Sequence, residues 1–144
     1  MIKTTVKGVL LILGLAALFL AGPLIYYFPM HNFRTVEEGV FYGSRQMSGR
    51  ALESTIEKRG IRTVINLRGE NPDSDWYKEE KAACERTGVT LVSMGWSQGS
   101  LPDPESLARF VDVVENGEGP FLAHCAGGTH RTGVAAAVYL LLKG

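Results

Sequence analysis

The stretch FLAHCAGGTHRTG, residues 121–133, predicts a strand that passes through a glycine-containing loop into a helix. Phe121 to His124 is short and apolar, as expected of a buried strand, and Thr132 to Leu142 is an apolar run of helical length. At such a junction successive backbone amides surround one point, and the positive end of the helix dipole lies behind them. The stretch therefore predicts an anion-binding loop in an α/β fold.

Two side chains of this loop combine a nucleophile with a fixed positive charge. We expect the thiol of Cys125 to ionise at neutral pH, because a helix N-terminus and a nearby cation both stabilise a thiolate. Arg131 supplies the cation, and its planar guanidinium can hold two oxygens of a phosphoryl group through the reaction. Gly127 and Gly128 allow the backbone to turn its amides inward. These features predict a cysteine-dependent phosphoester hydrolase.

The pattern from residue 31 onward predicts one α/β domain at residues 31–144, with strands and helices in alternation. This order implies a mostly parallel sheet with helices on both faces, in a chain that is short for an enzyme of this kind. The expected strands are Gly39–Tyr42, Ile61–Leu67, Val89–Met94 and Phe121–His124, and the expected helices run from a cap at Ser48 to Gly60 and over Trp76–Thr87, Pro102–Asn116 and Thr132–Leu142.

The pattern His124-Cys125-x-x-Gly128-x-x-Arg131-Thr132-Gly133 resembles the signature loop of the protein tyrosine phosphatase superfamily. FYGS at 41–44, VINLRG at 64–69 and WYKEE at 76–80 are also similar to bacterial dual-specificity-like cysteine phosphatases, and the resemblance extends over residues 32–144. The ending HRTG at 130–133 is similar to that of atypical fungal and plant phosphatases that cleave inositol pyrophosphates. The resemblance implies the cysteine phosphatase fold and hydrolysis of phosphotyrosine or phosphoserine/threonine.

The resemblance also implies roles for individual residues. Cys125 would be phosphorylated during turnover, Arg131 would bind the phosphoryl group, and Thr132 would stabilise the thiolate as it leaves. The implied substrate-binding residues are His124, Ala126, Gly127, Gly128, Thr129, His130 and Thr132. Among them, His124, the residue before the cysteine, would act by orienting the loop. No metal or cofactor is needed, and the implied partner is a phosphorylated protein or a small phosphorylated substrate.

Two features depart from the family pattern. The expected general acid is an aspartate on a loop before the cysteine, but no aspartate lies between Ser93 and Leu101, so Asp103 is the nearest candidate. Asp103 lies between two prolines just before a predicted helix, and capping that helix is the alternative role. The family normally continues with further helices, whereas this sequence ends at Gly144, and a domain truncated at its C-terminus is one interpretation.

Residues 8–30 contain neither a charged side chain nor a histidine, and the run from Val9 to Leu20 is almost wholly apolar. About 20 such residues span a bilayer as a helix, so we expect residues 1–30 to be a membrane anchor. Lys3 and Lys7 precede the run, which favours a cytoplasmic N-terminus and a domain outside the cytoplasm, periplasmic if the source is bacterial. A cleaved signal peptide and a buried helix of a soluble fold are the alternatives.

Charge and cysteine content argue against two other classes of protein. All 15 acidic side chains follow residue 30, whereas two of the 15 basic ones precede it, so the domain is slightly acidic and nucleic-acid binding is not expected. Cys84 and Cys125 do not form a disulfide framework, so we expect two separate thiols. Cys84 lies in a predicted helix and is expected to be buried, with no catalytic role.

Several alternatives to a phosphoprotein phosphatase remain open. An inositol (pyro)phosphate phosphatase would use the same loop, and a pseudophosphatase module would bind phosphate with little turnover if an effective acid were lacking. A rhodanese-like sulfurtransferase also holds a cysteine in a loop, but Arg131 and the Thr132-Gly133 ending favour phosphate. Arg68, at the expected carboxyl end of a strand together with Glu70 and Asn71, is a candidate for a supporting role in the site.

Overall fold

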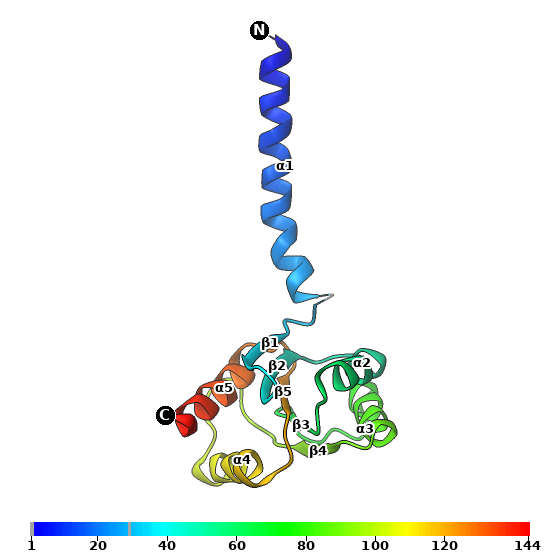
Figure 1. Cartoon of the computed structure of the whole chain (residues 1–144), viewed down its shortest axis with the longest axis vertical. Helices are drawn as coiled ribbons and strands as arrows, with labels where there is room; N and C mark the ends of the chain where they lie inside the picture. The colour runs from blue at the N-terminus through cyan, green and yellow to red at the C-terminus, as the bar shows by residue number, and fades with distance from the viewer. Residues whose placement is uncertain (1, 29) are drawn as a thin grey trace. The chain divides into compact units, whose positions relative to one another are not determined.

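The computed structural model describes residues 2–28 and 30–144, with side chains from Val6 onward except at residue 29. Contacts divide the chain into two units, Met1–His31 and Asn32–Gly144. The first unit contains one long helix, and the second contains the sheet and the remaining helices (Figure 1). Each unit is described by itself below.

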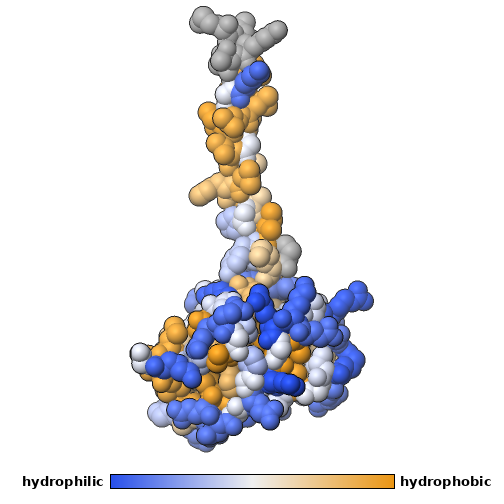
Figure 2. All heavy atoms as spheres, in the orientation of Figure 1, coloured by the Kyte–Doolittle hydropathy of each residue, from blue (hydrophilic) through white to orange (hydrophobic). Residues whose placement is uncertain are grey.

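The first unit is built on helix α1 (Ile2–Tyr27). Its stretch Val6–Tyr27 is apolar, and none of the residues in its most apolar window is buried. Figure 2 shows hydrophobic side chains along much of this helix. At a rise of about 1.5 Å per residue, its 22 residues extend about 33 Å, close to the thickness of a bilayer's hydrocarbon core. By length and composition, α1 is therefore able to cross a membrane.

The second unit is built on a five-stranded sheet of order β1-β2-β5-β3-β4. β1 pairs antiparallel with β2, and the pairs β2–β5, β5–β3 and β3–β4 are parallel. The carboxyl ends of β2, β5 and β3 consequently meet at one edge of the sheet. The strands are β1 (Arg34–Glu37), β2 (Phe41–Arg45), β3 (Thr63–Asn66), β4 (Thr90–Ser93) and β5 (Phe121–Cys125).

Helices cover both faces of this sheet, two on each side (Figure 1). One face packs against α2 (Gly49–Arg59) and α3 (Asp75–Thr87). The other packs against α4 (Pro104–Asn116) and α5 (His130–Lys143). Successive side chains of β5 alternate between the two faces, so Leu122 is buried toward α2 and α3, whereas Cys125 is buried toward α4 and α5.

The predicted α/β fold with a mostly parallel sheet is confirmed. The helices expected to end at Gly60 and Gly88 do so, and both glycines adopt the left-handed conformation with φ of +64° and +68°. Strand β1 was not predicted, because its alternating half-buried and exposed side chains include charges at Arg34 and Glu37. The strand expected at Gly39–Tyr42 starts later, at Phe41, because Gly39 has φ +75° in the turn after β1.

Candidate active site

The strand order places the end of β5 between β2 and β3. Arg45, the last residue of β2, is in register with Cys125, and the Leu67 amide donates a hydrogen bond of 2.9 Å to the carbonyl of His124. The chain then passes through residues 126–129 into α5, which begins at His130. Neighbouring strands therefore hold the start of the predicted anion-binding loop, residues 125–131, from both sides.

Gly128 is the position of this loop where a side chain is excluded. Its φ is +70°, which L side chains rarely adopt, and a Cβ there would lie 2.5 Å from the backbone nitrogen of Arg45 and 2.6 Å from the carbonyl carbon of Ser44. The loop consequently packs directly on the backbone at the end of β2. This close packing fixes the direction in which the loop turns.

Cys125 lies at the start of the loop and is 3% exposed. Its sulfur accepts a hydrogen bond of 3.2 Å from the Gly128 amide. Burial raises the pKa of this thiol, but hydrogen bonds from Thr132 and Gly128 and the charge of Arg131 outweigh burial, so the pKa lies below its usual value. The site therefore stabilises the thiolate, which is the nucleophilic form of cysteine.

The backbone of the loop offers hydrogen-bond donors around this sulfur. Within the described part of the chain, no protein acceptor receives a hydrogen bond from the amides of Ala126, Gly127, Thr129, His130 and Arg131. The last two belong to the first turn of α5, where the helix itself leaves amides without partners. Converging amides of this kind bind tetrahedral anions such as phosphate. We call residues 125–131 the phosphate cradle.

Arg131 is held rigidly beside the cradle. Its side chain is buried, and Nη1 donates to the carbonyls of Leu67 at 3.2 Å and of Trp96 at 3.3 Å. Its Nε is also buried and has no hydrogen-bond partner in the described residues. Because two carbonyls fix one side of the guanidinium, the opposite side remains available for phosphoryl oxygens.

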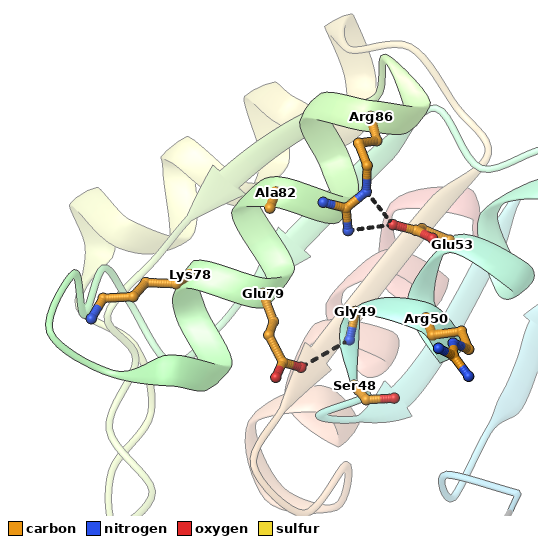
Figure 3. Close-up of a pocket in the computed structure, with 8 residues that line it drawn as sticks. All are labelled: Ser48, Gly49, Arg50, Glu53, Lys78, Glu79, Ala82 and Arg86. Atoms are coloured by element: carbon orange, nitrogen blue, oxygen red, sulfur yellow. Dashed lines mark hydrogen bonds and ion pairs between the residues drawn. The ribbon is translucent and has the colours of Figure 1, made fainter.

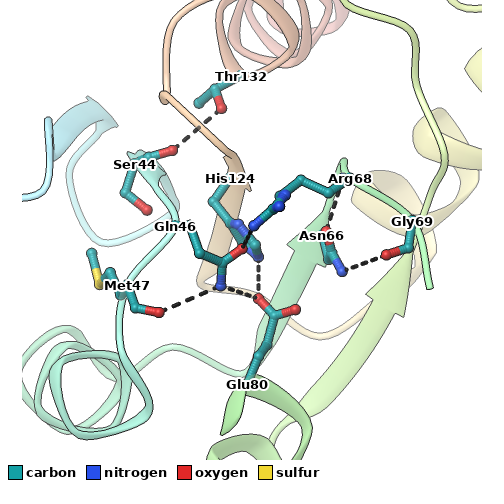
Figure 4. Close-up of polar contacts among 9 residues, drawn as sticks. All are labelled: Ser44, Gln46, Met47, Asn66, Arg68, Gly69, Glu80, His124 and Thr132. Atoms are coloured by element: carbon teal, nitrogen blue, oxygen red, sulfur yellow. Dashed lines mark hydrogen bonds and ion pairs between the residues drawn. The ribbon is translucent and has the colours of Figure 1, made fainter. Parts of the chain in front are cut away.

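Thr132 joins the cradle to β2. Its hydroxyl donates to the carbonyl of Ser44 at 3.3 Å (Figure 4), and its backbone amide helps to lower the pKa of Cys125. A Cβ on Gly43 would lie 2.9 Å from the methyl carbon of Thr132, so a glycine there allows α5 to approach β2 closely. Thr132 thus lies within hydrogen-bonding reach of the Cys125 sulfur, and its role during turnover stays a prediction.

His124 is not placed as expected of a substrate-binding residue. Its imidazole is buried on the α3 side of the sheet, in contact with the buried carboxylate of Glu80 (Figure 4). Because side chains alternate along β5, His124 and Cys125 lie on opposite faces. His124 therefore reaches the cradle only through the backbone. Thr129 and His130 have exposed side chains, and their amides are the groups that belong to the cradle.

Asp103 is placed as a helix cap. Its carboxylate accepts hydrogen bonds from the amide of Ser106 at 2.9 Å and from its hydroxyl at 2.8 Å. These two hydrogen bonds lower the pKa of Asp103, which is fully exposed at the start of α4. A low pKa disfavours the protonated form that a general acid requires. The structure therefore favours the capping alternative for this residue.

Two residues that the sequence did not single out hold the cradle from outside. The side-chain amide of Asn32 donates to the carbonyl of Gly127 at 3.0 Å, and the guanidinium of Arg34 donates to the carbonyl of Gly128. With these carbonyls bound on the outside, the amides of the same peptide groups turn inward: that of Gly128 donates to the Cys125 sulfur, and that of Thr129 can face a ligand. Asn32 lies 95 residues before its partner, so no local spacing reveals the contact.

A surface hollow between α2 and α3 is a separate feature (Figure 3). Two of its charged groups bind each other, because Nε of Arg86 donates to Glu53 at 2.7 Å, and Glu79 accepts from the backbone amide of Gly49 at 3.2 Å. None of its lining residues belongs to the phosphate cradle. The hollow is lined by Ser48, Gly49, Arg50, Glu53, Lys78, Glu79, Ala82 and Arg86. We assign it no part in the chemistry, because it is separate from the cradle.

Cys84 differs from Cys125 in the direction in which its surroundings shift the thiol pKa. Both thiols are free, as expected, and they lie in different core clusters on opposite faces of the sheet. Burial, together with the negative charges of Glu80 and Glu85, raises the pKa of Cys84 to about 12. Cys84 therefore remains a neutral, unreactive thiol at physiological pH.

A protein-family model matches residues 31–143. The matching family is described as a DSP-PTPase phosphatase fused to NAD+ kinase. Among individual proteins, receptor-type tyrosine-protein phosphatase V of Rattus norvegicus is 33% identical over 93 residues, which are 56% of this chain and 5% of the rat protein. This chain thus spans a small part of that relative.

Solved structures resemble the chain over a larger share of its length. The core catalytic domain of the PP-IP phosphatase SIW14 from S. cerevisiae, in complex with citrate, is 25% identical with a TM-score of 0.64, and the match covers 78% of this chain and 66% of that one. P. aeruginosa TpbA in complex with pTyr is 22% identical with a TM-score of 0.61, and the match covers 80% and 65% of the two chains. The second likeness concerns the fold alone.

We expect iodoacetamide at neutral pH to modify Cys125 well before Cys84, because only Cys125 has a lowered pKa. Mass spectrometry of the digested chain over a pH series measures both rates. As the pH is lowered, the rate at which Cys125 is modified should begin to fall only at a pH below the ordinary thiol pKa of about 8.5. A Cys84→Ala control should leave the Cys125 profile unchanged. Equal labelling of both thiols, or an inflection of the Cys125 profile near the ordinary value, would contradict the assignment.

Replacing Arg34→Gln should weaken binding of vanadate, a phosphate analogue, by roughly tenfold, because the carbonyl of Gly128 loses a charged donor and the cradle loosens. Competitive inhibition measures the affinity. Arg62→Gln is the matched control, since Arg62 is exposed and precedes β3 at the opposite end of the sheet. If both variants bind vanadate equally well, Arg34 does not position the loop.

Proposed function

Because the chain belongs to the family described as DSP-PTPase phosphatase fused to NAD+ kinase, we propose that it hydrolyses phosphoesters through a cysteinyl-phosphate at Cys125. The observation that supports this most directly is the phosphate cradle itself. A buried sulfur with a lowered pKa lies among amides without protein partners, beside the buried Nε of Arg131. This arrangement suits a tetrahedral dianion under attack by a thiolate.

The proposed reaction has two steps. In the first, the Cys125 thiolate attacks phosphorus, a sulfur–phosphorus bond forms, the bond to the leaving oxygen breaks, and that oxygen takes a proton. In the second, water attacks the same phosphorus, the sulfur–phosphorus bond breaks, inorganic phosphate leaves, and the thiolate is regenerated. Arg131 and the loop amides bind the equatorial oxygens in both steps. Thr132 stabilises the thiolate each time it forms.

Phosphorylated proteins, with phosphotyrosine or phosphoserine/threonine as the reacting residue, are the proposed substrates. The tyrosine phosphatase among the relatives and the pTyr bound to TpbA support this class. Inositol pyrophosphates are a second candidate class, because SIW14, described as a PP-IP phosphatase, is 25% identical to this chain. Both classes present a terminal phosphoryl group to the same cradle.

Asp103 remains the proposed proton donor to the leaving oxygen, although its contacts are those of a cap. It is the first carboxylate after β4 along the sequence, and the only one between β4 and α4. To act as an acid it has to release Ser106 and gain a proton, because its hydrogen bonds to that residue lower its pKa. Activated esters, whose leaving groups need no proton, would depend least on this residue.

The decisive variants are Cys125→Ser and Arg131→Lys. Cys125→Ser should abolish hydrolysis but retain phosphate binding, because a hydroxyl is not ionised at neutral pH and the cradle persists. Arg131→Lys should lower kcat/KM by about 10²- to 10³-fold, because an ammonium group cannot make the two-point contact. Steady-state hydrolysis of p-nitrophenyl phosphate measures both, with Cys84→Ala as the control that retains activity. Hydrolysis that persists in Cys125→Ser would overturn the mechanism.

We also propose that α1 anchors the protein in a membrane and that the phosphatase unit lies outside the cytoplasm. The apolar stretch Val6–Tyr27 supports the anchor, and Lys3 and Lys7 before it support the orientation. The full chain should remain in the membrane fraction after a high-salt wash. Protease added to cells with a permeabilised outer layer should degrade the phosphatase unit. Release as a shortened soluble species would indicate a cleaved signal, and full protection from protease would reverse the topology.

A further inference from the structure

Arg68 lies beside the phosphate cradle but takes no part in it. It follows Leu67, whose amide binds the carbonyl of His124 and whose carbonyl binds Arg131. On the other side of β5, the amide of Gln46 donates to the carbonyl of Ala126 at 3.4 Å. Arg68 and Gln46 therefore follow the two strands that flank the cradle, at the edge of the sheet where the cradle lies.

The side chain of Arg68 is held in one orientation. Its guanidinium carbon lies 3.5 Å from the ring centroid of Trp76, and its Nη1 donates to Oε1 of Gln46 at 3.1 Å. This second contact bridges the residues that follow β3 and β2 (Figure 4). The side chain of Gln46 is held in turn, because its Nε2 donates to the buried carboxylate of Glu80 at 3.4 Å. Stacking and this hydrogen bond keep the guanidinium at the rim of the site.

The positive charge of Arg68 is not paired with a carboxylate. Among the ion pairs of the described residues, none includes Arg68, although Arg59 and Arg86 each bind a glutamate. Burial and the charge of Arg131 lower the pKa of Arg68 and outweigh the opposing charges of Glu80 and Cys125, so Arg68 lies within electrostatic reach of the reacting groups. Arg131 binds the carbonyl of Leu67, the residue before Arg68. This edge therefore carries two cations, of which only Arg131 is needed to hold the reacting phosphoryl group, and this suggests a ligand with two anionic groups.

We propose that Arg68 forms a second anion subsite, which binds an anionic group of the substrate next to the phosphoryl group held by Cys125 and Arg131. This inference rests on the proposed function and specifies the substrates of the same site. The anionic group is a second phosphate in a diphosphate, or a carboxylate beside a phosphorylated residue. Trp76 and Gln46 act as positioning residues, because they fix the guanidinium through stacking and a hydrogen bond.

The test measures binding rather than turnover, with the full chain in detergent micelles and a Cys125→Ser background. Calorimetry gives dissociation constants for inorganic phosphate and pyrophosphate, and for phosphotyrosine peptides with glutamate or glutamine next to the phosphotyrosine. The preference is the dissociation constant of the ligand with one anionic group divided by that of the matched ligand with two. It should fall about tenfold in Arg68→Gln, the effect of losing one charge-assisted contact. It should not change in Arg62→Gln, which removes an exposed positive charge far from the cradle.

Each preference is a ratio within one variant, so a partial loss of folded protein cancels. A fall for pyrophosphate alone identifies the second group as a phosphate, and a fall for the peptides alone identifies it as a carboxylate; either supports the subsite. Unchanged preferences in Arg68→Gln, or an equal fall in Arg62→Gln, would overturn it. Hydrolysis by the unaltered chain is measured separately, and its absence would count against the proposed function, not against the subsite.

Discussion

Stabilisation of a thiolate at the junction of β5 and α5 is the constraint on which the rest of the structure depends. The buried Cys125 sulfur can ionise only if nearby donors outweigh the cost of burial, and those donors come from the loop and the first turn of α5. Gly128 permits the sharp turn, and its close contact with the end of β2 leaves no room for a side chain. The parallel arrangement of β2, β5 and β3 places this turn at the edge where both neighbouring strands also end.

The two faces of the sheet have different tasks. Cys125 is buried toward α4 and α5, where its sulfur receives the hydrogen bonds that stabilise the thiolate. On the opposite face, the buried imidazole of His124 contacts the buried carboxylate of Glu80 in α3, which also accepts a hydrogen bond from the side chain of Gln46. Side-chain alternation along a strand creates this division. The reacting group and the polar contacts that shape its surroundings consequently occupy different layers of one small domain.

The fold and the centre of the site could be predicted because their signals are local. Cys125, Gly128 and Arg131 lie within seven residues of sequence, and the glycines after α2 and α3 mark the helix ends directly. The contacts that were missed are long-range: Asn32 and Arg34 bind carbonyls more than 90 residues away. The placement of His124 depends on its contact with Glu80 of helix α3, which no spacing in the sequence indicates. Asp103 was ambiguous because a cap and an acid require the same carboxylate at the same position.

The most direct test of the account is to trap the covalent intermediate. The full chain would be mixed with a radiolabelled phosphate ester, quenched with acid during the first turnover, and digested for mass spectrometry. The account predicts label on the peptide that contains Cys125, and no label in Cys125→Ser. Hydrolysis without labelled protein, or label on any other residue, would contradict the proposal that Cys125 is the nucleophile.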